Sequence, residues 1–188
     1  MKLTPLGIDG AWLAESPVWS DDRGSFREWF KSKDVKVAIG REFGIEQANI
    51  SISNAGSLRG IHYSIAPRGQ AKWITCVSGS IQDVIVDIRP DSKTLGQWID
   101  VVLKGDSGKA ILISEGLGHG YLALEDNTAV AYLVSTLFSP KDEFEINPLD
   151  EKIGIKWGMD FGSLKISSKD KIAPTLAERF AEGKLPIF

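Results

Sequence analysis

The sequence contains a single cysteine, Cys76, which excludes an intramolecular disulfide and a thiolate metal cluster. In a stretch that alternates like a strand, such a cysteine is most simply a small buried apolar residue. Histidine is almost as scarce, since only His62 and His119 occur among the 188 residues. Two imidazoles cannot supply the usual ligand set of a histidine-rich metal centre. We therefore expect a functional site without a metal.

Long apolar runs and an excess of basic charge are also missing. No apolar run approaches the roughly 18 residues that cross a bilayer, and the first residues lack the basic-then-apolar pattern of a secretion signal. The formal net charge of −3 argues against a general basic surface for nucleic acid. We expect a cytoplasmic protein that binds neither membranes nor nucleic acid, although arginines gathered in one cleft still attract an anionic small molecule.

Short strands dominate the hydrophobic pattern. The segments that alternate, or that form short apolar runs, are 26–30, 47–53, 71–77, 81–88, 97–103, 110–114, 121–124 and 129–136. Helical periodicity is confined to residues 34–43, where Asp34 suits a cap, and to residues 174–182, where Gly183 suits a stop. Many short strands with few helices favour an antiparallel sandwich or barrel. Because there is no linker or repeat, we expect one domain over residues 1–188.

The segment from Leu58 to Tyr63 carries the most suggestive chemistry. It places His62 three residues after Arg59, and Lys72 follows ten residues later. A neutral imidazole is the side chain best suited to take a proton near neutral pH. A nearby lysine or arginine keeps that imidazole neutral and stabilises an anion formed when the proton leaves. The pattern therefore favours proton abstraction from carbon.

The two strands that follow this segment each carry one charged residue in an apolar run. We expect strands 71–77 and 81–88 to pair as a hairpin around the turn at residues 78–80. Lys72 lies on the first strand and Asp83 on the second, and burying either charge is costly unless it is paired. The two residues form either a cross-strand ion pair or part of a functional site, and these alternatives are not exclusive.

Other polar residues have two interpretations each. The polar face of strand 47–53 either meets solvent or lines a cavity. Arg23 and Arg27 either hold a phosphate, with Phe26 as a platform for a nucleotide base, or belong with Phe26 to a solvated hairpin. Tyr132 is typical of a buried phenol with one structural hydrogen bond. His119, within a glycine-rich turn, is either an exposed loop residue or a ligand. The pattern alone leaves these alternatives open.

The motifs in combination resemble those of one known family. They are, in chain order, Asp22-Arg23-Gly24-Ser25-Phe26-Arg27-Glu28, Gln47-x-Asn49-x-Ser51, Leu58-Arg59-Gly60-Ile61-His62-Tyr63, Lys72, Asp83-Val84-x-Val86-Asp87-x-Arg89, Gly96-Gln97-Trp98, Glu115-Gly116-x-Gly118-His119-Gly120 and Ser168-Lys169-Asp170. Together they resemble the dTDP-4-dehydrorhamnose 3,5-epimerase family over residues 5–175. Residues 108–119 are also similar to half of the cupin metal signature, but no His-x-His pair exists, so the sequence favours a metal-free barrel.

The resemblance implies a jelly-roll cupin fold and a homodimer in which the N-terminal segment crosses to the partner. It implies epimerisation of a dTDP-linked 4-keto-6-deoxyhexose without a cofactor. The 4-keto group acidifies the hydrogens on its neighbouring carbons, so a base and an acid on opposite faces can invert a centre. By resemblance, His62 is the base oriented by Asp170, Lys72 stabilises the enolate oxygen, and Tyr132 returns the proton. Asp83 would support this catalytic cluster.

The resemblance also implies a set of substrate-binding residues. Arg23 and Arg59 would hold the phosphates. The residues assigned to the nucleotide and the sugar are Phe26, Glu28, Gln47, Asn49, His119, Phe138, Glu143 and Lys169. Phe138 stands where family members commonly have a tyrosine. The sequences of residues 114–119 and 147–150 are more similar to those of the family branch that acts on modified deoxysugars. Members of that branch epimerise C3 only or C5 only.

Three other functions remain as alternatives to an epimerase. A related ketoisomerase would move the carbonyl between C3 and C4, which product analysis distinguishes. A catalytically silent nucleotide-sugar binding protein needs neither a base, nor an acid, nor a cation for the enolate, so their joint presence argues against it. A purely structural sandwich leaves the clustered cations unexplained.

Overall fold

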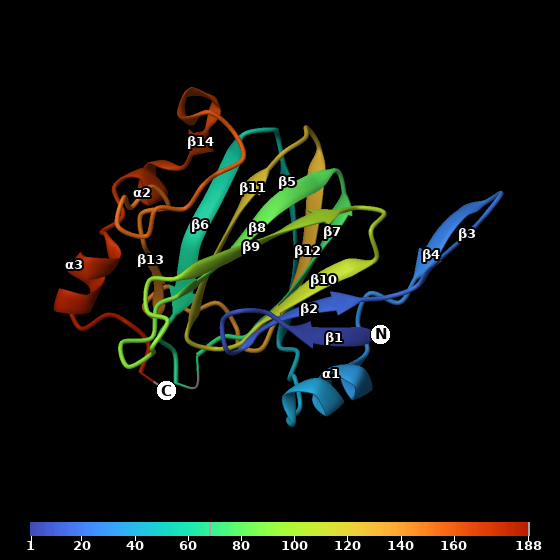
Figure 1. Ribbon diagram of the computed structural model, residues 1–188, viewed down its shortest axis with the longest axis horizontal. Coiled ribbons are helices and arrows are strands. Elements are labelled where there is room, and N and C mark those ends of the chain that lie inside the picture. The colour runs from blue at the N-terminus through green and yellow to red at the C-terminus, as the bar shows by residue number, and fades with distance from the viewer. Residues whose placement is uncertain (68, 188) are drawn as a thin grey trace.

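The computed structural model describes residues 1–67 and 69–187, and two antiparallel sheets make up its body (Figure 1). The first sheet has the strand order β1 (Lys2–Pro5), β2 (Ala11–Glu15), β10 (Lys109–Ile113), β7 (Lys72–Ser78), β12 (Thr128–Val134), β5 (Gln47–Ser53). The second has the order β13 (Glu143–Glu145), β6 (Ser57–Ser64), β11 (Leu117–Ala123), β8 (Ser80–Asp87), β9 (Trp98–Lys104), and β14 (Lys165–Ile166) runs parallel to β6. The predicted all-β jelly roll is confirmed.

The core lies between the two sheets. Its main cluster joins Ile74 and Val130 of the first sheet to Ile85 and Leu103 of the second, and all four side chains are buried. Because side chains alternate along a strand, the residues between these positions point to the outer faces. On β8, Val84 belongs to a separate outer cluster. Apolar side chains thus fill the centre between the sheets. The polar side chains that face inward lie at one end of this space.

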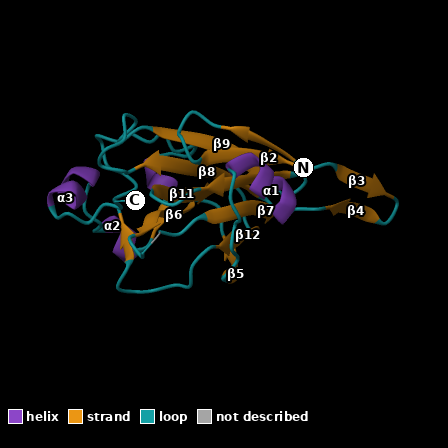
Figure 2. Ribbon diagram, turned by 90° about the horizontal axis from the view of Figure 1, so that it is seen from below, coloured by secondary structure: helices purple, strands orange, loops and turns teal. Residues whose placement is uncertain are grey.

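Helices and a hairpin lie outside the two sheets. The helices are α1 (Ser32–Ile39), the short 3₁₀ turn Phe161–Ser163, α2 (Ser168–Lys171) and α3 (Leu176–Ala181). The hairpin of β3 (Val18–Asp21) and β4 (Gly24–Arg27) projects well beyond the sheets in both views (Figures 1 and 2). None of the helices in the described chain is long and apolar enough to cross a membrane.

Both predicted helices exist, with shifted ends. The helix predicted at 34–43 begins at Ser32, so Asp34 lies in its first turn and is not its cap. It ends at Ile39, and Gly40 follows as the cap with a left-handed φ of 73°. The helix predicted at 174–182 begins after Thr175, which forms a capping box with Glu178.

The predicted hairpin between strands 71–77 and 81–88 is wrong. Strand β7 pairs with β10 and β12, whereas β8 pairs with β9 and β11, so the turn at 78–80 carries the chain from one sheet to the other. Both strands are central and buried, and a buried apolar run carries no information about which strand is its neighbour. Lys72 and Asp83 are therefore not cross-strand partners. The strand predicted at 26–30 is also too long, since β4 ends at Arg27.

Candidate active site

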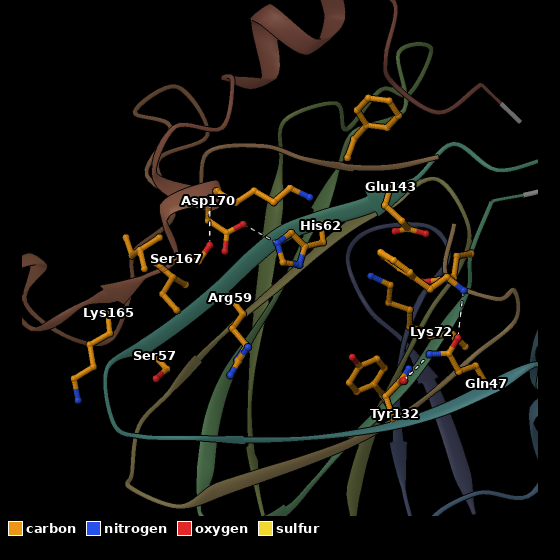
Figure 3. Close-up of a pocket in the computed structure, with 18 residues that line it drawn as sticks. Gln47, Ser57, Arg59, His62, Lys72, Tyr132, Glu143, Lys165, Ser167 and Asp170 are labelled. Atoms are coloured by element: carbon orange, nitrogen blue, oxygen red, sulfur yellow. Dashed lines mark hydrogen bonds and ion pairs between the residues drawn. The ribbon is translucent and has the colours of Figure 1, made fainter. Parts of the chain in front are cut away.

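A cavity of about 780 Å³ opens at the polar end of the interior. Its walls come from β5, β7 and β12 of the first sheet and from β6, β13 and β14 of the second, together with α2. Its lining includes Gln47, Asn49, Arg59, His62, Lys72, Tyr132, Phe138, Glu143, Lys169 and Asp170. A smaller cavity of about 190 Å³ shares Arg59, His62, Lys72 and Tyr132 with it. Ten of the residues predicted for the site therefore lie around one cavity (Figure 3).

The first sheet supplies an aligned row of polar side chains. Its register places Tyr132 beside Asn49 on one side and beside Ile74 on the other, and places Val134 between Gln47 and Lys72. Residues two apart on a strand share a face, so Gln47, Asn49, Lys72 and Tyr132 all face the interior. The polar face of strand 47–53 therefore lines a cavity, which decides between the two interpretations of its alternation.

The second sheet supplies Arg59 and His62 through a bulge in β6. Tyr121 and His119 of β11 are two residues apart but pair with Arg59 and His62, which are three apart. The extra residue brings both side chains into the cavity. Gly60 lies within this bulge at a φ of 114°, and a Cβ there would stand 2.5 Å from the Cα of Gly120. The Arg-Gly-x-His spacing is thus a backbone requirement of the site.

His62 forms a pair with Asp170, whose Oδ1 lies 2.8 Å from Nε2 of the imidazole (Figure 3). The backbone N–H of Asp170 donates to Oγ of Ser167, which caps α2. Burial alone would raise the pKa of Asp170, but the hydrogen bond and charge of His62 outweigh it and hold that pKa below its usual value. With Nε2–H donated to a carboxylate, Nδ1 of His62 is the nitrogen that can accept a proton.

Lys72 and Tyr132 lie on the first sheet, across the cavity from His62. Lys72 is only 9% exposed, and burial lowers its pKa, although the carboxylates of Glu143 and Asp83 oppose that shift. Burial, followed by the neighbouring Tyr121, raises the pKa of the Tyr132 phenol. The phenol therefore keeps its proton over the range in which an imidazole is neutral. A base and a proton donor thus face each other from opposite sheets.

Glu143 of β13 contributes an unusual carboxyl group to the cavity wall. Among the described residues, its Oε1 is the one buried side-chain polar atom without a hydrogen-bond partner. Burial raises the pKa of Glu143, while the charge of Lys72 opposes the shift. Buried polar atoms are normally hydrogen-bonded, so an unpaired one at a cavity wall is suited to a ligand hydroxyl.

The second histidine also has an aspartate partner. Nε2 of His119 lies 3.0 Å from both carboxylate oxygens of Asp83, whose side chain is fully buried. His119 stands in strand β11 directly opposite His62, so the exposed-loop interpretation of this residue is wrong. It lines the smaller cavity. Among the described residues, the ion pair of Asp83 is therefore with His119 and not with Lys72.

Comparison with known proteins agrees with this geometry. The family model for dTDP-4-dehydrorhamnose 3,5-epimerase matches residues 5–178. The chain belongs to this family. It is 44% identical to a dTDP-4-dehydrorhamnose 3,5-epimerase of Mycolicibacterium smegmatis over 99% of this chain and 91% of that protein. It is 42% identical to a dTDP-4-dehydro-6-deoxyglucose 3-epimerase of a Streptomyces species over 98% of this chain and 93% of that protein.

The structural similarity is equally close. The crystal structure of ChmJ, a 3′-monoepimerase from Streptomyces bikiniensis in complex with dTDP-quinovose, matches with a TM-score of 0.92 and 41% identity. The match covers 97% of this chain and 91% of that one. The resemblance to the epimerase family and the expected class of enzyme are therefore confirmed. Both 3,5-epimerases and 3-epimerases occur among the relatives.

Three of the predicted substrate-binding residues do not line the cavity of their own chain. Arg23 and Phe26 lie on the projecting hairpin, and Glu28 follows it. Arg23 pairs with Asp21 at 2.5 Å, and Glu28 pairs with Lys31 at 2.7 Å. In the epimerase fold, this hairpin extends away from the sheets (Figure 2). These three residues therefore lie away from the cavity that the other predicted site residues share.

Several residues of the epimerase site were missed by sequence reasoning. The cavities are also lined by Ser51, Ser57, Gln70, Tyr121, Phe144, Lys165 and Ser167. Alternation along 57–59 is a signal that puts Ser57 on the face of Arg59, but no local signal brings Lys165 beside Ser57, because β14 and β6 are far apart in the sequence. Among the described residues, no three histidine, cysteine, aspartate or glutamate side chains gather as a metal site would require.

Proposed function

We propose that this protein epimerises C3, C5 or both centres of a dTDP-linked 4-keto-6-deoxyhexose. One observation carries the proposal: the His62–Asp170 pair and the Tyr132 phenol face each other across one cavity, with Lys72 buried in its wall. Family membership supports it, because the relatives are 3-epimerases and 3,5-epimerases of dTDP-sugars. The dTDP-sugar bound by the structurally similar 3′-monoepimerase supports this class of substrate.

The first step is removal of a proton from the carbon next to the ketone. Nδ1 of His62 takes this proton, and the imidazolium that forms is stabilised by the Asp170 carboxylate at 2.8 Å. The electrons of the broken C–H bond move to the ketone oxygen and give an enolate. The ammonium group of Lys72 stabilises that oxygen, and a cation in a buried wall does so more strongly than a cation in water.

The second step returns a proton to the same carbon from the opposite face. Tyr132 belongs to the first sheet and His62 to the second, so a sugar ring between them meets a base on one face and a donor on the other. The raised pKa of the phenol keeps it protonated until the enolate forms. Inversion therefore follows from the position of the two groups on opposing sheets.

The remaining residues of the cavity bind and orient the substrate. Arg59 supplies a guanidinium suited to phosphate oxygens, and Lys169 supplies a second cation, which pairs with Glu145 at 2.7 Å. Gln47 binds Asn49 through Nε2, and its Oε1 accepts from the backbone N–H of Phe138. We assign these amides and the Phe138 ring to the nucleoside, and the unpaired Glu143 carboxyl to a sugar hydroxyl.

The proposed active form is a homodimer in which the β3–β4 hairpin reaches the partner's cavity. The hairpin carries Trp19 and Phe26, which stack on each other at 5.9 Å and are 50% and 66% exposed. The outer face of edge strand β5 exposes Ile50 and Ile52 at 73% and 68%. Neighbouring large apolar side chains that are this exposed are typical of a protein interface. Arg23 and Phe26 then complete the phosphate and base subsites of the second copy.

A complementation experiment tests this dimer. We would mix an Arg23→Ala variant with a His62→Ala variant under conditions that exchange subunits. A crossing hairpin gives mixed dimers one intact site, so activity should return to about a quarter of the wild-type value if subunits mix randomly. If the mixture stays inactive although mass measurement shows mixed dimers, the hairpin does not serve the partner's site.

The proposed reaction is tested by proton NMR of dTDP-4-keto-6-deoxyglucose with the protein in heavy water. Exchange at both C3 and C5 identifies a 3,5-epimerase, and exchange at one position identifies a mono-epimerase. A product with its ketone at C3 would identify the ketoisomerase alternative instead. If dTDP binds but neither position exchanges for this sugar or its amino- and methyl-substituted analogues, the epimerase proposal is wrong.

A further inference from the structure

Tyr121 is a buried phenol that the proposed reaction does not use. It is 5% exposed and lines the smaller cavity beneath the reacting groups. On its own sheet it stands opposite Arg59 of β6. Its hydroxyl reaches across the interior to the first sheet, where it lies 2.7 Å from Oγ of Ser51 and 3.4 Å from Oγ of Ser53. The side chain thus connects the two sheets at the floor of the site.

Ser53 also binds Arg59, because Nε of Arg59 donates to Oγ of Ser53 at 3.2 Å. A guanidinium has no acceptor, so this bond fixes the direction of the others. Since Ser53 accepts from Arg59, its own proton is free for the oxygen of Tyr121, and the Tyr121 proton is free for Ser51. Ser53 and Tyr121 then each accept one hydrogen bond and donate one, and Ser51 accepts the hydrogen bond at the end of the series.

This series constrains a side chain that otherwise has considerable freedom. Arg59 is an exposed residue at the cavity wall, and a long arginine side chain loses rotamer entropy when it is fixed. The bond from Nε to Ser53 leaves the two terminal nitrogens of the guanidinium for a ligand. Ser53 is itself 4% exposed and is held in place by the Tyr121 hydroxyl.

We propose that Tyr121 is a positioning residue that fixes the guanidinium of Arg59 for the substrate diphosphate through Ser53. The inference rests on the proposed function, because the orientation of Arg59 matters only if the cavity binds an anionic nucleotide. It assigns the phenol a role in affinity for the diphosphate, separate from the proton transfers of His62 and Tyr132.

The test is the Tyr121→Phe variant, which removes one oxygen and keeps the ring. We expect the Kd for dTDP, measured by calorimetry, and the KM for the dTDP-sugar to rise about three- to tenfold, as loss of one hydrogen bond predicts. The change in kcat should be smaller. Tyr63→Phe is the matched control, because Tyr63 is 1% exposed, is not among the lining residues of either cavity, and donates its hydroxyl proton to the backbone of Lys184 at 2.9 Å. It should bind dTDP like the wild type.

A double-mutant cycle with Arg59→Ala shows whether the phenol acts through Arg59. In that background, Tyr121→Phe should no longer weaken dTDP binding. An equal loss with and without Arg59, or an unchanged Kd in Tyr121→Phe, overturns the inference. Ser53→Ala breaks the series at its middle and decides the matter if Tyr121→Phe does not fold. A wild-type protein that binds no dTDP would instead overturn the proposed function, on which the inference depends.

Discussion

The two histidines of this chain stand opposite each other on neighbouring strands, and each has an aspartate partner. Their surroundings differ. The side chain of His62 is 42% exposed, and its partner Asp170 comes from a short helix near the end of the chain. The side chain of His119 is 11% exposed, and its partner Asp83 is fully buried on the adjoining strand β8.

The difference in exposure suits the two His–Asp pairs to different roles. A general base must reach its substrate, so the open pair suits proton transfer in the larger cavity. The enclosed pair fixes its own geometry, with Nε2 of His119 held between two carboxylate oxygens at 3.0 Å. The two pairs contain the same residue types and differ in exposure and in the source of the carboxylate, and we therefore assign the base to the more exposed pair.

The largest effect is expected from His62→Ala. Removal of the base should reduce proton exchange at the reacting carbon by roughly 10² to 10⁴-fold, while the protein stays folded and still binds dTDP. Exchange is measured by proton NMR in heavy water, and dTDP binding by calorimetry. Full activity in this variant would remove His62 from its assigned role and end the contrast between the two pairs.

The next largest effect is expected from Asp170→Asn. The amide keeps the shape of the side chain but does not stabilise the imidazolium, so kcat should fall about 10- to 10³-fold with a smaller change in KM. The stability of this variant should also respond less to acid. Because the folded-state pKa of Asp170 is lowered, its contribution to stability is present above the unfolded value near 3.9 and is lost as pH falls through the folded value.

Thermal unfolding at several pH values between about 5 and 3 checks this contribution. Wild type should lose stability more steeply on acidification than Asp170→Asn. If stability falls equally steeply with pH in both proteins, the His62–Asp170 pair makes no pH-dependent contribution to the stability of the fold.

A smaller effect is expected in the alkaline part of the pH–rate profile. Lys72 lines both cavities, and burial lowers its pKa, so its charge is lost below the usual lysine value near 10.4. Activity should fall as pH rises through that lowered pKa, whereas Tyr132, with a raised pKa, still holds its proton there. The profile of kcat against pH shows this limb. If kcat falls only at or above the ordinary lysine pKa, Lys72 is not the cation that stabilises the enolate.

The smallest effect on rate is expected from Asp83→Asn in the enclosed pair. This variant weakens the contact with His119 and should reduce kcat less than tenfold, in contrast with Asp170→Asn. Its main cost should be in stability, about 1–3 kcal/mol from chemical unfolding, because a buried polar pair loses part of its hydrogen bonding. A loss of rate equal to that of Asp170→Asn would show that both pairs take part in proton transfer.

The sequence by itself determined which face of each strand is polar. Alternation has a period of two whatever the neighbours are, so Gln47 and Asn49 had to share a face, as did Lys72 and Ile74. The motifs in combination identified the family, and the resemblance predicted His62 as the base with Asp170 as its partner. Motifs of this kind are local, and the chemistry that they carry can be recognised before any fold is known.

Only the tertiary structure decided which strands meet. Strands β7 and β8 are adjacent in sequence and largely buried, yet they belong to opposite sheets. Lys72 and Asp83 are therefore not strand partners, and Asp83 pairs with His119 instead. The link from Tyr121 through Ser53 to Arg59 spans three strands and two sheets. A buried apolar run looks the same beside any partner, so pairing is selected by packing across the whole core, which a local pattern does not contain.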